Sequence, residues 1–327
     1  MPFRGPPAPR FKPAMPMHWR MAESLVGAGG WGYFSGTLAA YAESFRFVEV
    51  NATFYRQIAD ATARRWRAQV PSDFVFAVKA HRDVSHGDRL RASVQGRAAF
   101  TRSLRTARLL RAPFLILETP ASLRFDSDQV KGLQDLAAMA PRRTRIGLEA
   151  RAYARRDLPE SLRRGMADGG VLDVVDLSQS KPRVPDDTQY TRLFGPGPHN
   201  VYEFDDEELQ EIDRRGRDAV RVAFTFHGVR MYSDAARFLT FKRTGMFPQA
   251  TPSRGLSSLE TVLTPDARFP SSKDDLVRDH GWKVIDLDNT TRAHAVRLLS
   301  TLPRQTFHNV REVVRALAAG DPDTKTG

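Results

Sequence analysis

The 327-residue sequence contains no cysteine. This absence excludes a disulfide-stabilised fold, metal sites built on thiolates and a catalytic cysteine. The sequence also lacks any apolar run near the roughly 18 residues that a membrane-spanning helix requires. The basic, proline-rich N-terminal residues include no apolar segment of the kind found in secretion signals. We therefore expect a cytoplasmic protein with no membrane partner.

Positive charge predominates in the sequence. The chain has 50 Lys and Arg residues against 38 Asp and Glu residues, a formal net charge of +12, and 41% of its residues are hydrophobic. The hydrophobic content is sufficient for a sizeable core. The positive excess favours anionic partners, either an anionic small molecule or nucleic acid. It is concentrated in residues 56–111, which hold 13 basic and 4 acidic residues.

Short apolar runs alternate with helix-like segments along most of the chain. Such runs, bounded by Gly, Pro or charged residues, are typical of strands buried on both faces. We expect strands at 24–30, 47–54, 74–81, 114–120, 145–151, 171–177, 190–195 and 220–228, and helices at 38–45, 59–70, 94–111, 127–140, 158–168, 205–215 and 232–244. Eight such units in this length predict a (β/α)8 TIM barrel. An open doubly wound sheet is the alternative, but no glycine-rich dinucleotide fingerprint follows the first strand.

The remaining residues divide the chain into three parts. Residues 1–20 are rich in proline and are expected to form a flexible tail, and residues 21–245 form the barrel. Residues 246–327 begin with a turn-rich linker, and their charges nearly cancel. We expect them to add a small C-terminal α+β module, with a strand at 282–287 and helices at 290–302 and 307–318.

Polar residues recur at the ends of the predicted strands. Because strand side chains alternate between faces, Glu49 shares a face with Asn51, opposite two valines. Similar pairs occur on strand three, with Lys79 and His81, and on strand five, with Glu149 and Arg151. Four other strands contribute one group each: Glu118, Asp176, Arg192 and His227. Helices cover the outside of a barrel, so these groups should point inward at the C-terminal mouth. One pair alone would indicate a structural ion pair, but this convergence predicts a ligand or catalytic site.

Four segments resemble the YecE-like family, known as domain of unknown function 72. They are GAGGWGY at 27–33, FVEVNATFY at 47–55, FVFAVKAHRDVSH at 74–86, and Glu149-x-Arg151. The resemblance covers roughly residues 24–245 and implies a TIM barrel, but it implies no particular reaction. The C-terminal extension more loosely resembles a small uncharacterised prokaryotic domain with a phenylalanine–proline and leucine–proline pattern.

The side chains at the mouth suit acid–base chemistry on an anionic ligand. Our first hypothesis is a hydrolase, lyase or isomerase acting on a phosphorylated, nucleotide or sugar-like molecule. Glu149 or Glu49 would be the acid–base group and Lys79 and Arg151 the anion clamp, so that Glu49, Lys79 and Glu149 are the catalytic candidates. The remaining ligand-binding candidates are Trp31, Asn51, Tyr55, His81, His86, Asp176, Arg192 and His227, with Trp31 and Tyr55 as walls.

Two other classes of protein stay open. A nucleic-acid-binding protein could use the basic surface of residues 56–111 without catalysis, although the sequence has no helix-turn-helix or zinc-finger signature. An interaction scaffold could dock through the C-terminal module. A metal centre drawn from His81, His86, Glu118, Glu149, Asp176 and His227 is less favoured, because Lys79 and Arg151 would repel a cation. We therefore expect no resident metal, and the sequence identifies no cofactor.

Overall fold

The computed structural model describes residues 23–34 and 36–320, so the predicted tail at 1–20 lies outside the described residues. Eight parallel strands form one sheet in the order β6-β5-β4-β3-β2-β1-β8-β7. They are β1 (Glu23–Ala28), β2 (Phe47–Val50), β3 (Val75–Lys79), β4 (Phe114–Glu118), β5 (Arg145–Glu149), β6 (Leu172–Asp173), β7 (Thr188–Leu193) and β8 (Arg221–Phe226). A parallel bridge between Val175 and Thr191 joins the two edges beyond β6, so the barrel is nearly closed. The predicted TIM barrel is confirmed.

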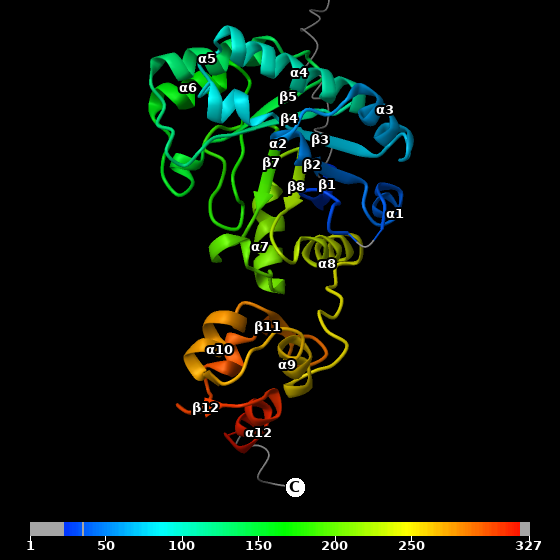
Figure 1. Ribbon diagram of the computed structural model, residues 1–327, viewed down its shortest axis with the longest axis vertical. Helices are drawn as coiled ribbons and strands as arrows, with labels where there is room; N and C mark the ends of the chain where they lie inside the picture. The colour runs from blue at the N-terminus through cyan, green and yellow to red at the C-terminus, as the bar shows by residue number, and fades with distance from the viewer. Residues whose placement is uncertain (1–22, 35, 321–327) are drawn as a thin grey trace, which may run out of the picture.

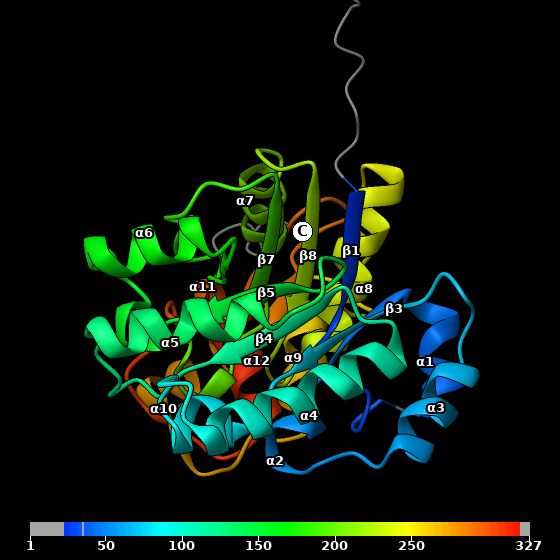
Figure 2. The ribbon, with the colours of Figure 1, turned by 90° about the horizontal axis from the view of Figure 1, so that it is seen from above.

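Helices surround the strands on the outside of the barrel (Figures 1 and 2). They are α1 (Leu38–Ser44), α2 (Ala52–Tyr55), α3 (Asp60–Ala68), α4 (Val94–Leu110), α5 (Ser127–Ala138), α6 (Glu160–Asp168), α7 (Asp206–Gly216) and α8 (Met231–Thr244). Local sequence determines where several of them begin. The Ser93 hydroxyl accepts from the Gly96 amide at the start of α4, and Asp126 and Asp205 each form a capping box at α5 and α7. No described helix is long and apolar enough to span a membrane.

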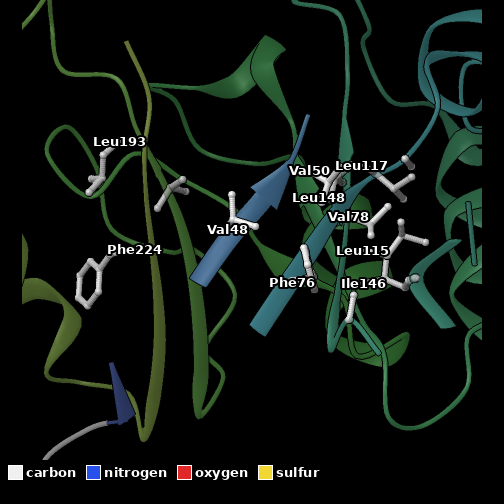
Figure 3. Close-up of a cluster of buried hydrophobic side chains, with 14 of the residues drawn as sticks. Val48, Val50, Phe76, Val78, Leu115, Leu117, Ile146, Leu148, Leu193 and Phe224 are labelled. Atoms are coloured by element: carbon white, nitrogen blue, oxygen red, sulfur yellow. The ribbon is translucent and has the colours of Figure 1, made fainter. Parts of the chain in front are cut away.

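Alternating strand residues divide the core into two layers. Outward-facing residues such as Val48, Phe76 and Leu115 pack beneath the helices (Figure 3). Inward-facing residues of the same strands, among them Phe47, Ala77 and Phe114, fill the barrel interior. The interior layer is apolar toward the N-terminal ends of the strands and becomes polar at the last inward positions, Glu49, Lys79 and Glu118. The strand alternation thus places ionisable groups at the C-terminal mouth, as predicted.

The C-terminal residues have their own hydrophobic cluster, which includes Leu259, Leu276 and Phe307. Their elements are α9 (Leu256–Leu263), β9 (Ser271–Ser272), α10 (Lys273–His280), β10 (Val284–Asp286), β11 (Arg292–His294), α11 (Val296–Leu299), β12 (Thr306–Phe307) and α12 (Val310–Gly320). The strand expected at 282–287 corresponds to β10, and the helix expected at 307–318 to α12. The helices α9 and α10 were not predicted.

The helix predicted at 290–302 is wrong. Residues 292–294 instead form β11, which pairs antiparallel with β10, and only the short helix α11 follows. The turn between the two strands is closed by the Leu287 amide donating to the Thr291 carbonyl at 2.9 Å. The Asp288 carboxylate also accepts from the Thr290 amide at 2.7 Å. This side-chain turn and the strand pairing override the helical pattern of the segment.

Residues 282–294 contact the end of the barrel near α7 (Figure 1). The Val284 amide donates to the Glu203 carboxylate at 3.0 Å, and Arg292 donates to Asp206 at 2.5 Å. His294 Nε2 lies 2.9 Å from the Glu203 carbonyl. These contacts hold the segment that connects β7 to α7.

Candidate active site

The centre of the mouth is Arg192, an almost completely buried residue of β7. Its guanidinium contacts three carboxylates from three other strands. Arg192 Nη2 lies 3.2 Å from Glu49 Oε1, and Arg192 Nη1 donates to Glu118 Oε2 at 2.5 Å and also to Glu149 Oε2. A buried guanidinium is stable only when such partners compensate its charge. Arg192 therefore ties β2, β4, β5 and β7 together electrostatically.

Glu49 lies beneath the cavity and is fully buried. Its Oε2 accepts a hydrogen bond of 2.8 Å from the Tyr190 hydroxyl, which is also fully buried. Tyr190 and Arg192 are two residues apart on β7, so both point into the barrel and both reach Glu49. Burial, and then the Glu49 charge, raise the pKa of the Tyr190 hydroxyl well above 10, which keeps it a donor. Glu49 holds the network in place from below and has no exposed surface for a ligand.

Lys79 and Glu118 form an ion pair in the wall of the cavity. Lys79 Nζ lies 2.8 Å from Glu118 Oε2 and 3.9 Å from the centre of the Phe54 ring. Burial, and then repulsion from Arg192, lower the pKa of the Lys79 amine. Burial alone would raise the pKa of the Glu118 carboxyl, but Arg192 and Lys79 outweigh it and lower that pKa from 4.5 to about 2. Glu118 is therefore ionised at neutral pH.

Glu149 differs from Glu118 although both contact the same nitrogen of Arg192. Burial raises the pKa of the Glu149 carboxyl, and the nearby Glu118 charge raises it further, while Arg192 acts in the opposite direction. Two carboxylates that share one cation repel each other, so that ionisation of one disfavours ionisation of the other. Environments that separate the pKa values of neighbouring acids are typical of acid–base sites.

His227 and Asn51 lie near the ends of β8 and β2. The His227 ring stacks on Phe194 at 4.6 Å between centroids. Burial, and then the Arg192 and Lys79 cations, hold the pKa of the His227 imidazole well below 6.5, so the ring is neutral at pH 7. Asn51 Nδ2 donates to the Gly29 carbonyl at 2.7 Å. Both side chains pack against Gly29, where an added Cβ would lie 2.2 Å from His227 Cε1.

These groups surround a cavity of about 1090 Å³. Among the predicted site residues, those that line it are Asn51, Tyr55, Lys79, Glu149, Arg151, Asp176, Arg192 and His227. Five cationic side chains and three carboxylates line it in total, and Tyr33 and Tyr55 stand at its rim with 92% and 70% of their surface exposed. The cavity therefore combines an excess of positive charge with aromatic surfaces, which suits an anionic ligand that also has a ring or apolar face.

Besides Glu49, which lies below the cavity, three predicted residues do not line it. Trp31 packs edge-on against Trp66, with centroids 5.0 Å apart. His81 leaves the barrel wall and pairs with Asp83 at 3.2 Å. His86 lies in the one-turn π-helix Asp83–Gly87, 3.0 Å from the Ser85 hydroxyl. The strand β3 ends at Lys79 and the chain then enters the π-helix, so alternation along the strand no longer predicts where His81 and His86 point.

Asp176 lines the cavity, but its carboxylate is used by the loops around it. It accepts from the backbone amides of Ser178, Phe194 and Gly195 at 2.9 to 3.0 Å. It also accepts from the Gln179 side chain at 3.0 Å. Asp176 therefore joins the loops after β6 and β7, and its oxygens have little remaining capacity for a ligand.

Sequence reasoning missed the roles of Tyr190 and Phe194 and left Glu118 out of the principal site. A signal for Tyr190 existed, because it lies two residues before Arg192 and must share its face of β7. Glu118 ends β4 at the same level as Glu149 on β5, and the strand register pairs these two residues directly. Phe194 follows β7 in a loop, and its stacking on His227 depends on how two loops meet.

Four of the six residues weighed as metal ligands, Glu118, Glu149, Asp176 and His227, line the cavity, but no three of the six, all of which the structure describes, bring their ligand atoms within 4.8 Å of one another. Within the described residues, ligand atoms of three histidine or acidic side chains come within 4.8 Å of one another at Asp205, Glu208 and His294. That group lies where the C-terminal residues contact α7, and its two carboxylates form the capping box of that helix.

The basic residues of segment 56–111 lie mainly on the outer helices α3 and α4 (Figure 2). Lys79 is the one residue of this segment that lines the cavity described above. Several of its arginines have partners on the surface; Arg105 pairs with Asp60, and Arg97 with Asp135 at 2.7 Å. The charge concentration that the sequence shows is thus largely separate from the mouth.

Comparisons with known proteins agree with this fold. The family model described as "Protein of unknown function DUF72" matches residues 30–245. A DUF72 family protein of Enterococcus faecalis V583 has a solved structure with a TM-score of 0.54 and 16% identity, covering 69% of this chain and 99% of that chain. One from Thermotoga maritima MSB8 has a TM-score of 0.51 and 17% identity, covering 68% and 99%. The comparison with curated proteins finds no significant match. The family resemblance found in the sequence is confirmed, and that of the C-terminal extension stays a prediction.

Proposed function

We propose that this chain, which belongs to the DUF72 family of proteins of unknown function, is an enzyme of the hydrolase, lyase or isomerase class. Its substrate would be an anionic phosphorylated, nucleotide or sugar-like molecule bound at the C-terminal mouth. The observation that carries this proposal is geometric: Glu118 and Glu149 meet on one buried guanidinium group, and Glu149 also lines the open cavity beside Arg151. Both contact one nitrogen of Arg192, yet the pKa of Glu118 is lowered and that of Glu149 is raised.

Glu149 is the general acid–base residue in this proposal. Its side chain lines the cavity, whereas Glu49 is completely buried below it. A raised pKa brings a carboxylic acid closer to neutral pH, where it can exchange a proton with a bound ligand efficiently. Glu118 stays ionised beside Lys79 and Arg192 and keeps both cations in position.

Arg151 binds the anionic group of the ligand. Its side chain is half exposed and lies 3.5 Å from Glu118 Oε1, so much of its hydrogen-bonding capacity is free. Arg155 also lines the cavity and donates to Gln179 at 2.7 Å. Two guanidinium groups on the loop after β5 suit a phosphate or carboxylate, which arginine binds with two parallel hydrogen bonds. Lys79, by contrast, is already paired with Glu118 and lies deeper.

The test is the Glu149→Gln variant, assayed against sugar phosphates, nucleotides and other phosphate esters by phosphorus NMR of substrate and product. Glutamine keeps the size of the side chain but cannot exchange a proton, so turnover should fall by about 100-fold or more. Glu43→Gln, at an exposed position on α1, is the control and should keep full turnover. Unchanged turnover by Glu149→Gln would remove this residue from the mechanism. Failure of the wild type to convert any of these compounds would refute the proposed substrate class.

Nucleic-acid binding through residues 56–111 stays a prediction. It would show as affinity for oligonucleotides that falls steeply with added salt, because phosphate contacts release counterions. Since most of this segment lies away from the cavity, such binding should be independent of Glu149.

A further inference from the structure

We infer that Gly29, Asn51 and His227 form a subsite for a hydroxyl-bearing, uncharged part of the ligand. The substrate would then be a small polyhydroxylated compound, such as a sugar or polyol, that carries one anionic group. This inference rests on the proposed function, because it names the class of molecule that the same cavity takes.

His227 supplies hydrogen-bonding capacity that the protein does not use. Its side chain is 6% exposed, and its nearest acidic neighbour, Glu49 Oε1, lies 3.7 Å from Nε2, beyond hydrogen-bond distance. The Nε2 atom is buried and has no hydrogen-bond partner. In a neutral imidazole one nitrogen donates a hydrogen bond and the other accepts one, and a hydroxyl group can pair with either nitrogen. Stacking on Phe194 holds the ring in this place.

Asn51 supplies a second unused atom. Its Nδ2 donates to the Gly29 carbonyl, so the orientation of the amide is determined and Oδ1 is left as an acceptor. That Oδ1 atom is buried and has no partner. Buried polar atoms are nearly always hydrogen-bonded in folded proteins. Arg192 Nε, at the charged centre of the mouth, is also unpartnered, but the two atoms beside Gly29 belong to neutral side chains and call for an uncharged ligand group as their partner.

Gly29 allows these two side chains to approach the same point. A Cβ there would lie 2.2 Å from His227 Cε1 and 2.9 Å from Asn51 Nδ2. No other residue type fits without moving both side chains. The absence of a side chain at position 29 is therefore what lets His227 and Asn51 line the cavity together.

The fold separates this uncharged region from the charged one. Gly29, Asn51 and His227 follow β1, β2 and β8, which are neighbours in the sheet. Arg151 and Arg155 follow β5, which lies three strands from β2 in the same order. A ligand that spans the cavity thus meets neutral hydrogen-bonding groups at one end and guanidinium groups at the other. This arrangement matches a molecule with hydroxyl groups at one end and a phosphate at the other.

The test compares inorganic phosphate with three sugar or polyol phosphates: ribose 5-phosphate, glucose 6-phosphate and glycerol 3-phosphate. Binding to the full-length protein is measured by isothermal titration calorimetry at pH 7.5. At least one of the three should bind about ten-fold more tightly than inorganic phosphate, because its hydroxyl groups form hydrogen bonds with His227 and Asn51. His227→Phe, which keeps a stacking ring, and Asn51→Ala should each remove most of this gain. Neither variant should change the affinity for inorganic phosphate.

Two further variants separate this inference from the proposed function. Arg151→Ala should weaken inorganic phosphate and the sugar phosphates by the same factor, and His308→Phe, at an exposed position on the C-terminal module, should change neither. The subsite is refuted if inorganic phosphate binds but none of the three esters binds more tightly than it, or if His227→Phe keeps the higher affinity for an ester. In either case the anion site of the proposed function stands. If inorganic phosphate does not bind at all, both are refuted.

Discussion

Removal of one hydroxyl group from Tyr190 tests how strongly the buried network beneath the cavity depends on its hydrogen bond to Glu49. Tyr190→Phe leaves the ring in place but deletes the 2.8 Å hydrogen bond to Glu49 Oε2. Both side chains are fully buried, so water cannot replace the lost donor. A hydrogen bond to a charged group contributes about 1.5–3 kcal/mol. We expect the free energy of unfolding, measured by urea titration, to fall by about this amount.

The control for this experiment is Tyr33→Phe, at a rim position that is 92% exposed. Its effect should stay within about 0.5 kcal/mol, as for other surface substitutions. The double variant Tyr190→Phe with Glu49→Gln should lose less than the sum of the two single changes, because the two side chains share one interaction. A loss for Tyr190→Phe no larger than that of Tyr33→Phe would refute the reasoning, since Glu49 would then not depend on this donor.

Three further predictions concern pH and the C-terminal contact, each measured by urea unfolding. As pH falls below 6.5, the wild type should lose stability relative to His227→Phe, because the unfolded imidazole takes up a proton that the buried ring resists. The pKa of Glu118 is lowered from 4.5 to about 2, so the ionised carboxylate stabilises the fold by about 3 kcal/mol above pH 4.5 and loses this effect toward pH 2. The free energy of unfolding of the wild type should therefore approach that of Glu118→Gln as pH falls from 5 to 3. A difference that stays constant over this range would contradict the prediction. Arg292→Ala should lower stability by about 1.5–3 kcal/mol, because it removes a charged hydrogen-bond donor from Asp206, which keeps its pairing with Arg237, whereas the exposed Arg297→Ala should have little effect.

Strand periodicity predicted much of the candidate site. Glu49, Lys79, Glu149, Arg192 and His227 were all expected to point inward, and the structure places them around or directly below one cavity. Periodicity failed where the strands end. His81 lies only two residues after Lys79, yet the strand has already ended, and its ring pairs with Asp83, the first residue of the π-helix, instead.

The C-terminal elements show a second reason for failure. Residues 290–302 have a helical pattern of apolar residues, but pairing of β11 with β10 and contact of Arg292 and His294 with the barrel favour a strand. Contacts between segments far apart in the chain outweigh local preference here, and no pattern within the segment records them.

The sequence by itself determined the barrel, the inward direction of the polar strand residues and the family. The barrel and the inward direction follow from periods of two and of about three and a half residues, which are properties of the local chain. The family follows from four short segments of sequence. Only the tertiary structure decided which groups meet. Arg192 is 143 residues from Glu49 in the sequence, yet its guanidinium group forms ion pairs with Glu49, Glu118 and Glu149. That sharing separates the pKa values of Glu118 and Glu149, because the field at each carboxyl group depends on distances in space that the order of residues does not contain.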